Sequence, residues 1–268
     1  MLIDINAYVG NWPFQQLKYN TCEALYDRMN KFGVDVSVIS NLNGIFYKNT
    51  QSANEELYEE IRSNRRFKDR FIPYAVINPI YAGWQDDLET CIKTYGFKGV
   101  RLYPRYHDYE ILDPACIELV KRVRDYGLPV AFNYRMMDSR ERSWMDISNM
   151  KGNAIREWNL KNILPIVNAV PDAKYMILNF ANAAKLDTEE MNLVKKSDLL
   201  FDTSGRTITN MADFLNLYGS DKFAFGTHSP ILDYLTGLLR IESLHSNEAD
   251  ENMKEMLRSG NAKKMLGL

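Results

Sequence analysis

Short apolar segments rich in β-branched residues recur along the chain, separated by stretches whose apolar residues have helical spacing. Each segment has the length and composition of a strand. Eight such segments are found: Leu2 to Val9, Val34 to Asn43, Arg70 to Asn78, Lys98 to Pro104, Pro129 to Tyr134, Lys174 to Ala181, Leu199 to Thr203 and Lys222 to Thr227. Because strand and helix alternate, the pattern predicts a parallel sheet.

Helix boundary signals support this division. Ser52 and Glu55 have the spacing of a capping box, and Asp113-Pro114 places a cap before a proline at the first helical position. Helix ends are indicated at Gly33, Gly96 and Gly127. With no linker between units, residues 1–268 are predicted to form one domain, an α/β fold closed as a single (β/α)8 TIM barrel. An open doubly wound sheet is less favoured, since no Gly-x-Gly-x-x-Gly follows a strand.

Composition narrows the function classes. The 268 residues are 46% hydrophobic and 25% charged, with a formal net charge of −2, which indicates a globular protein without affinity for nucleic acid or membranes. Cys22, Cys91 and Cys116 are too few and too widely spaced for a disulfide framework or a structural zinc site. No apolar stretch approaches the roughly 20 residues of a membrane-spanning helix, and a cytoplasmic location is predicted.

Strand alternation predicts which side chains enter the barrel. The outer face must be apolar to receive the helices, so Ile3 and Ile5 are directed outward and Asp4, Asn6 and Tyr8 inward. Later strands add further inward polar residues: Arg101, Tyr103, Asn133, Arg135, Asn179 and His228. Sites of such barrels lie at the carboxyl ends of the strands, so a polar site is predicted there.

Several motifs carry a family resemblance. They are the opening strand with Asn11-Trp12-Pro13-Phe14, Gly99-Val100-Arg101-Leu102-Tyr103-Pro104, Pro129-Val130, Phe225-Gly226-Thr227-His228-Ser229-Pro230 and the closing Gly260-Asn261-Ala262-Lys263-Lys264-Met265-Leu266-Gly267-Leu268. Together they resemble the amidohydrolase-related family of metal-dependent hydrolases and decarboxylases. The resemblance runs nearly end to end and implies a TIM barrel that binds one or two divalent metals.

The resemblance also implies a ligand set that this chain lacks. Family members carry His-x-His on the first strand, a His on the fifth, another on the sixth and an Asp on the eighth. These positions hold different residues here: Asn6, Tyr8, Asn133, Asn179 and His228. Members with a carboxylated lysine on the fourth strand place it near Arg101, and arginine cannot form that carbamate.

The substitutions argue against a conventional metal. A catalytic zinc needs about three protein ligands of imidazole, thiolate or carboxylate type, and a neutral amide is a poor replacement. His228 is the one strong donor left at the mapped positions. No cofactor is therefore expected. A zinc bound at a rearranged site that uses Asp4, Asp202 or His107 is the less favoured alternative.

Roles can still be assigned to the polar residues. His228 is the candidate general acid or base, with Asp4 to orient it and Tyr8 as proton donor. The planar guanidinium of Arg101, with that of Arg135, suits a carboxylate. The remaining residues are predicted to bind or polarise the substrate: Asn6, Tyr103, Asn133 and Asn179. A network in which these groups only satisfy one another is the alternative.

Two kinds of function remain open. The first is a hydrolase that cleaves an ester, lactone or amide of a small anionic, carboxylate-bearing compound, with decarboxylation as the second reaction class. The other is a catalytically inactive protein that kept the barrel and binds a small molecule. The sequence identifies no substrate and leaves the oligomeric state, including a homo-oligomer, undecided.

Overall fold

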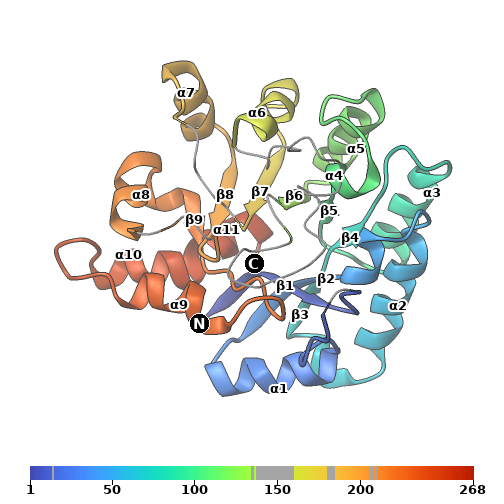
Figure 1. The fold of residues 1–268 in the computed structure, drawn as a ribbon, viewed down its shortest axis with the longest axis horizontal. Helices are drawn as coiled ribbons and strands as arrows, with labels where there is room; N and C mark the ends of the chain where they lie inside the picture. The colour runs from blue at the N-terminus through green and yellow to red at the C-terminus, as the bar shows by residue number, and fades with distance from the viewer. Residues whose placement is uncertain (14, 134–135, 137–159, 180–184, 206–207, 209) are drawn as a thin grey trace.

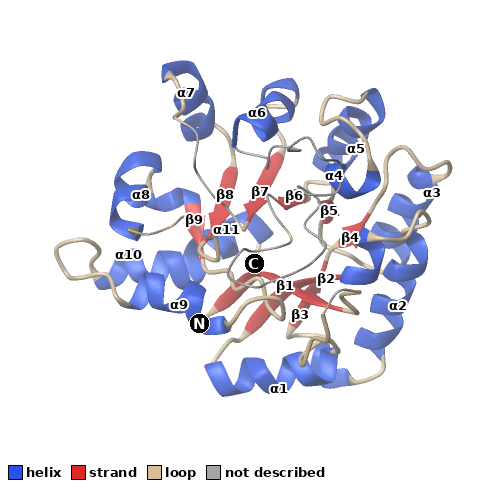
Figure 2. Cartoon of the chain, in the orientation of Figure 1, coloured by secondary structure: helices blue, strands red, loops and turns tan. Residues whose placement is uncertain are grey.

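The computed structural model describes residues 1–13, 15–133, 136, 160–179, 185–205, 208 and 210–268. Its strands lie at the centre, with helices around them (Figures 1 and 2). The described strands are β1 (Ile3–Val9), β2 (Val36–Asn41), β3 (Phe71–Pro73), β4 (Ala75–Val76), β5 (Val100–Leu102), β6 (Pro129–Asn133), β7 (Lys174–Leu178), β8 (Leu199–Asp202) and β9 (Phe223–Ala224).

Helices follow the strands along the chain. The α-helices are α1 (Cys22–Phe32), α2 (Gln51–Arg62), α3 (Trp84–Glu89), α4 (Pro104–His107), α5 (Pro114–Asp125), α6 (Leu160–Ala169), α7 (Thr188–Lys196), α8 (Met211–Tyr218), α9 (Tyr234–Glu242), α10 (Glu251–Glu255) and α11 (Asn261–Leu266). Short 3-10 turns are η1 (Leu42–Ile45), η2 (Arg65–Phe67) and η5 (Ser220–Lys222). Two π-helical turns, η3 (Thr90–Thr94) and η6 (Met256–Gly260), continue α3 and α10.

The paired strands are parallel and close into a barrel. Pairing runs β1-β2-β3 and then from β4 to β9 in chain order. Where β3 meets β4, Tyr74 N donates to the Ile39 oxygen of β2 (2.8 Å) and Ala75 N donates to the Gly99 oxygen just before β5 (2.9 Å), so this segment joins β2 on one side to β5 on the other. These two short strands together form the predicted third strand.

The last strand segment meets the first. Ile5 N donates to the Phe225 oxygen at 3.0 Å, and His228 N donates to the Asn6 oxygen at 2.7 Å. Tyr8 N donates to the Ser229 oxygen at 2.8 Å. The predicted (β/α)8 barrel is therefore confirmed, with a seam between β1 and the chain after β9.

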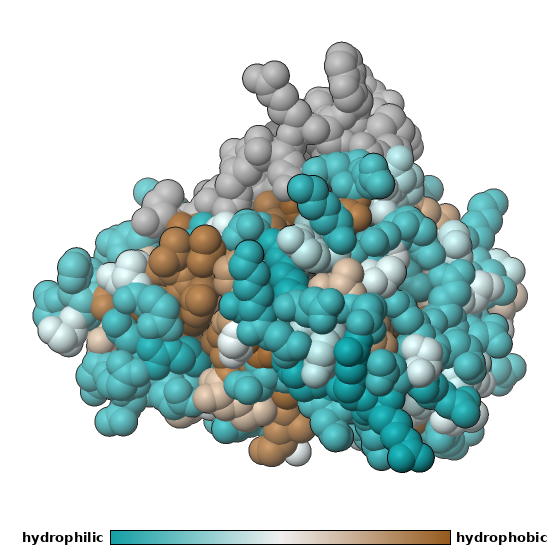
Figure 3. Space-filling view, turned by 90° about the horizontal axis from the view of Figure 1, so that it is seen from below, coloured by the Kyte–Doolittle hydropathy of each residue, from teal (hydrophilic) through white to brown (hydrophobic). Residues whose placement is uncertain are grey.

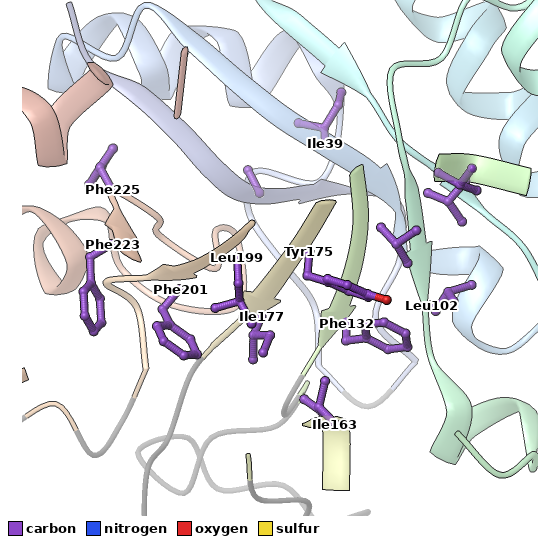
Figure 4. Packing of buried hydrophobic residues seen from close by; sticks show 14 of the residues in the cluster. Ile39, Leu102, Phe132, Ile163, Tyr175, Ile177, Leu199, Phe201, Phe223 and Phe225 are labelled. Carbon is purple, nitrogen blue, oxygen red and sulfur yellow. The ribbon is translucent and has the colours of Figure 1, made fainter. Parts of the chain in front are cut away.

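Two apolar layers hold the barrel. The outer layer lies between strands and helices, where the Phe132 and Tyr175 rings stack with centroids 6.5 Å apart beside Ile163 of α6 (Figure 4). The inner layer includes Met176, and α11 contributes Met265 to it. Cys22, Cys91 and Cys116 are buried free thiols.

The alternation predicted for β1 is partly wrong. Ile3 and Ile5 belong to the inner layer rather than to the layer beneath the helices. A register shift between Asp4 and Ala7 marks a bulge or irregularity, after which Tyr8 lines the interior. The Asp4 side chain consequently lies on the opposite face of the strand from Ile3 and Ile5.

One predicted helix start is also wrong. Helix α2 begins at Gln51, one residue before Ser52, and the Asn49 side chain accepts the Gln51 N–H at 3.1 Å. The side chain that accepts an N–H at the start of α2 therefore belongs to Asn49, whereas the capping-box spacing predicted Ser52 for this role. The other cap is confirmed, because Asp113 accepts the Ala115 N–H at 2.8 Å at the start of α5. Gly33 ends α1 in the left-handed conformation as predicted.

Two glycines allow α9 to approach the barrel closely. A Cβ at Gly237 would lie 2.1 Å from the Gly226 oxygen, and a Cβ at Gly226 would lie 2.6 Å from the Asp202 Cβ. Both contacts are shorter than packing permits, and backbone and a strand residue cannot easily move aside. The glycines therefore fix the position of Asp202.

Gly237→Ala is expected to lower the free energy of unfolding by about 2 kcal/mol, because the added methyl group overpacks α9 against Gly226. Urea unfolding followed by circular dichroism would measure the loss. Gly33→Ala is the comparison: no atom lies within 4 Å of its Cβ position, so its cost arises from the positive φ of 67° alone. A Gly237→Ala protein as stable as wild type would contradict this packing.

The outer surface is mainly hydrophilic on the face that Figure 3 shows, with limited hydrophobic areas. Exposed apolar side chains include Leu235 and Leu239 of α9. None of the described helices is long and apolar enough to cross a bilayer.

Candidate active site

The predicted site residues converge at the carboxyl ends of the strands. The Asn6 Nδ2 donates to Asp202 Oδ2 at 2.6 Å and lies 3.2 Å from His228 Nδ1. The Tyr8 hydroxyl lies 3.5 Å from the same His228 nitrogen and accepts a hydrogen bond from Asn133 Nδ2. Four predicted residues and Asp202 thus form one buried network joining β1, β6, β8 and the segment after β9.

The bonds to His228 define its protonation. Its Nε2 lies 2.9 Å from the Met136 carbonyl oxygen, which can only accept, so Nε2 carries the hydrogen. Nδ1 is then the lone-pair atom that faces the N–H of Asn6 and the hydroxyl of Tyr8. The backbone of His228 has a positive φ of 58°, which aims the ring inward from the loop. The neutral imidazole is therefore an acceptor at Nδ1, where the Asn6 N–H faces its lone pair, and a donor at Nε2.

Tyr8 holds its proton at neutral pH. Burial raises the pKa of its hydroxyl to about 12, although Arg101 and the hydrogen bond from Asn133 act in the opposite direction. The Arg101 guanidinium carbon lies 4.4 Å from the centroid of the Tyr8 ring. Tyr8 is thus a protonated donor beside a cation and a hydrogen-bond donor, both of which would stabilise its anion.

Arg101 places a positive charge inside the barrel. It is 0% exposed, and its Nη1 donates to the Ala7 carbonyl oxygen at 3.2 Å. Its Nε and Nη2 have no hydrogen-bond partner in the described structure. A buried cation with two unused donors leaves a strong binding position for an anion.

The asparagine side chains also present unused atoms. Asn6 Nδ2 donates to Asp202, and Asn133 Nδ2 donates to the Tyr8 hydroxyl. The Oδ1 atom of each amide has no partner in the described structure. Asn179, 1% exposed with φ of 52°, has neither amide atom bonded within that part of the chain. Because its φ is positive, the Asn179 side chain no longer follows the alternation of side chains along β7. Within the described residues, these side chains therefore do not satisfy all of one another's hydrogen-bonding groups.

Asp4 acts on His228 indirectly. Its carboxylate accepts from Asn6 N (3.0 Å), Thr227 N (3.0 Å) and Thr227 Oγ (2.6 Å). Burial raises the pKa of Asp4 to about 6, against the lowering effect of these hydrogen bonds. The predicted orienting contact to the imidazole is replaced by backbone contacts, since the Asn6 oxygen accepts the His228 N–H.

The sequence reasoning considered Asp202 only as a ligand of the less favoured rearranged zinc site, and it did not consider Ser204. Asp202 is fully buried at the end of β8, and Ser204 Oγ donates to its Oδ2 at 2.6 Å. Strand alternation could have predicted that Asp202 faces inward, because Leu199 and Phe201 belong to the outer layer.

An apolar wall borders the network on one side. Tyr8 packs in one cluster with Trp12, Tyr103, Met136 and Ile231, as predicted for Tyr103 at the mouth. The Tyr103 hydroxyl is buried and has no partner in the described structure. A ligand at Arg101 would therefore meet both polar atoms and an apolar surface.

Two other sequence candidates are not seen in this network. Arg135 falls outside the described residues. His107 is buried, and its Nε2 lies 3.0 Å from the Gly44 carbonyl oxygen. Burial lowers the pKa of His107, which favours the neutral imidazole.

The sequence profile described as Amidohydrolase matches residues 11–154, more than half of the chain. The chain belongs to the amidohydrolase family. No match is found among curated proteins.

Solved structures share the whole fold of this amidohydrolase-family chain. A presumed amidohydrolase from Staphylococcus aureus has a TM-score of 0.73 and 18% identity, covering 100% of this chain and 99% of that one. The 2,6-dihydroxybenzoate decarboxylase from Rhizobium has a TM-score of 0.71 and 14% identity, with 99% and 98% covered. The 5-carboxyvanillate decarboxylase from Sphingomonas paucimobilis has a TM-score of 0.69 and 14% identity, with 100% and 99% covered.

The family resemblance implies a divalent metal, and the donors present do not suit one. Asn6 and Asn133 turn amide N–H groups, which cannot ligate, toward the centre of the network. Tyr8 is a neutral phenol, and the Nδ1 atom of His228 faces the Asn6 amide. The donor set therefore differs from the imidazole and carboxylate ligands that zinc and related ions take.

Proposed function

We propose that this amidohydrolase-family barrel is an enzyme acting on a small carboxylate-bearing compound, with Arg101 as the anion anchor. The observation that carries the proposal is the buried guanidinium whose Nε and Nη2 find no partner in the described structure. A substrate carboxylate would accept both N–H groups and neutralise the charge. The unpartnered amide oxygens of Asn6, Asn133 and Asn179 suit hydroxyl or amine donors on the same compound.

The first reaction class is hydrolysis of an ester, lactone or amide. Tyr8 donates its hydroxyl proton to the oxygen or nitrogen that leaves, and the Asn133 N–H and the Arg101 charge stabilise the resulting phenolate. His228 Nδ1 accepts a proton from the attacking water once the Asn6 N–H turns away from its lone pair, and it then passes a proton to the Tyr8 phenolate 3.5 Å away, which restores both groups. The acyl–heteroatom bond breaks, and the products are an acid and an alcohol or amine.

Decarboxylation is the second reaction class. It is favoured by the fold shared with the two decarboxylases, although identities of 14% extend only to the fold. Tyr8 would then protonate the carbon that loses CO₂. Release of CO₂ against release of a new alcohol or amine separates the two classes.

We also propose that the site works without a metal cofactor, because its donors are amides, a phenol and an imidazole whose lone pair faces an amide N–H. Turnover is then expected to be the same before and after chelation and after addition of zinc or manganese. A substrate-dependent activity that is lost on chelation and restored by one metal would contradict this.

Arg101→Gln is expected to weaken binding of a carboxylate ligand by about 10- to 100-fold, because charge-assisted hydrogen bonds are lost. A panel of small hydroxylated and amino carboxylates would be tested by calorimetry and then for turnover. Arg101→Lys keeps the charge without the planar fork and should recover only part of the affinity. Arg122→Gln, on the exposed surface of α5, is the matched control.

Two outcomes would reject parts of this proposal. Equal affinity of wild type and folded Arg101 variants would remove Arg101 as the anchor. Tight binding with no turnover of any bound compound would instead indicate the binding protein that lost its chemistry.

A further inference from the structure

We infer, from the metal-free site proposed above, that the Asn6 amide nitrogen stands where a cation would bind, so that one carboxylate at this position creates a metal site. The two hydrogens of the amide nitrogen match two acceptors. Asp202 Oδ2 lies 2.6 Å from Asn6 Nδ2, and His228 Nδ1 lies 3.2 Å from it. A carboxylate oxygen and an imidazole lone pair thus point at one nitrogen.

Both acceptors are of the kinds that bind divalent ions. Carboxylate and neutral imidazole are ordinary ligands of zinc, and two of them already converge. Within the described residues, no three His, Cys, Asp or Glu side chains group to hold a metal. The pair formed by Asp202 and His228 lacks one ligand, and Asn6 lies between them.

The two ligands are already held in the way that metal sites hold theirs. A metal-bound histidine usually donates its second ring N–H to a carbonyl or carboxylate, and His228 Nε2 lies 2.9 Å from the Met136 carbonyl oxygen. Ser204 Oγ donates to Asp202 at 2.6 Å, as an outer ligand partner would. The close approach of Gly226 fixes the backbone beneath Asp202.

The Asn6 amide excludes a cation because its two N–H groups engage a lone pair of Asp202 Oδ2 and the lone pair of His228 Nδ1. A metal entering between Asp202 and His228 would have to displace the Asn6 N–H groups from both partners. The Asn6 main chain cannot easily withdraw, because its carbonyl oxygen accepts the His228 N–H at 2.7 Å and its N–H donates to Asp4 at 3.0 Å. The amide therefore substitutes for a bound cation without carrying charge.

Asn6→Asp tests the inference with zinc alone. The new carboxylate would face Asp202, repel it, and complete a set of two carboxylates and one imidazole with an open position. After incubation with Zn²⁺ and gel filtration, the variant is expected to retain about one zinc per chain. At about 100 times Kd, Zn²⁺ should raise its Tm by roughly 5 °C or more. Wild type should retain none and show no shift.

Asn54→Asp is the matched control. It adds a buried carboxylate at α2, where the Asn54 side chain bonds the Val76 backbone and Gln51 among the described residues, away from Asp202 and His228. Its Tm should not respond to Zn²⁺. In the double variant Asn6→Asp/His228→Ala the zinc should be lost, which places the ion at this pair.

Two results would overturn the inference: wild type that retains stoichiometric zinc lost in Asp202→Asn, or a folded Asn6→Asp protein that binds none. If Asn6→Asp does not fold, Asn6→His supplies the third ligand without adding a negative charge, and its Tm should rise with Zn²⁺ where wild type does not. No Zn²⁺ response in a folded Asn6→His protein would then reject the inference. Carboxylate binding by Arg101 is measured separately in wild type, so failure of the proposed function would be distinguishable.

Discussion

Tyr8→Phe is expected to lower kcat for the substrate of this site by about 10²- to 10⁴-fold, the range of a lost general acid. The ring, the cluster with Trp12 and the stacking of Arg101 would remain, because only the hydroxyl is removed. With the hydroxyl gone, the Asn133 N–H keeps its contact with the sulfur of Met136. The loss should therefore fall on kcat while KM changes little, which steady-state kinetics would show.

Tyr175→Phe is the control for removing a buried phenol. Its hydroxyl donates to the backbone oxygens of Ile166 and Val170 in the outer layer. We expect a stability cost of about 1 kcal/mol with unchanged kcat. If Tyr8→Phe retained wild-type kcat, the proton donor would have to be another group.

Asp4→Asn should make the protein's stability less dependent on pH. Burial raises the pKa of Asp4 from 3.8 to about 6, so the folded state favours the protonated acid. The stability contributed by this group is complete below pH 3.8 and is lost as the pH rises through 6. The shift corresponds to about 3 kcal/mol. Asparagine resembles the protonated form and does not titrate.

Urea unfolding of both proteins from pH 3.5 to 7.5 would measure the effect. The stability of Asp4→Asn minus that of wild type should rise by about 3 kcal/mol across this range and level off above pH 7. Asp113→Asn is the control, since either residue caps α5 well and its difference should stay small. A constant difference between Asp4→Asn and wild type would show that Asp4 titrates normally in the fold.

The repeating pattern along the chain was sufficient to predict the barrel and the inward residues of strands that keep strict alternation. Arg101, Asn133 and His228 lie where that rule placed them, because β5 and β6 are regular and the last strand ends at a turn. The same rule failed for Ile3 and Ile5, since a register shift within β1 changes the face of the following residues. The strand propensities of the residues do not indicate where such a register shift occurs.

The partner of Asn6 was beyond sequence reasoning for a different reason. Asn6 and Asp202 are 196 residues apart in the sequence. Their side chains meet because the closed barrel brings β1 and β8 close together. The family resemblance implied that Asn6 stands at the position of a histidine ligand, but it did not indicate what Asn6 bonds to. Likewise, α2 begins before Ser52, and the Asn49 side chain accepts the Gln51 N–H at its start, so Ser52 lies inside the first turn.

The seam between β1 and the segment after β9 gives the site an order of assembly. Asn6 and His228 are 222 residues apart and share both a side-chain contact and a backbone bond across this seam. Contacts of such sequence separation form late, after the loop entropy between them has been lost. The groups proposed to be catalytic thus come together only when the first and last strands join, and a ligand held there would slow the separation of the two chain ends.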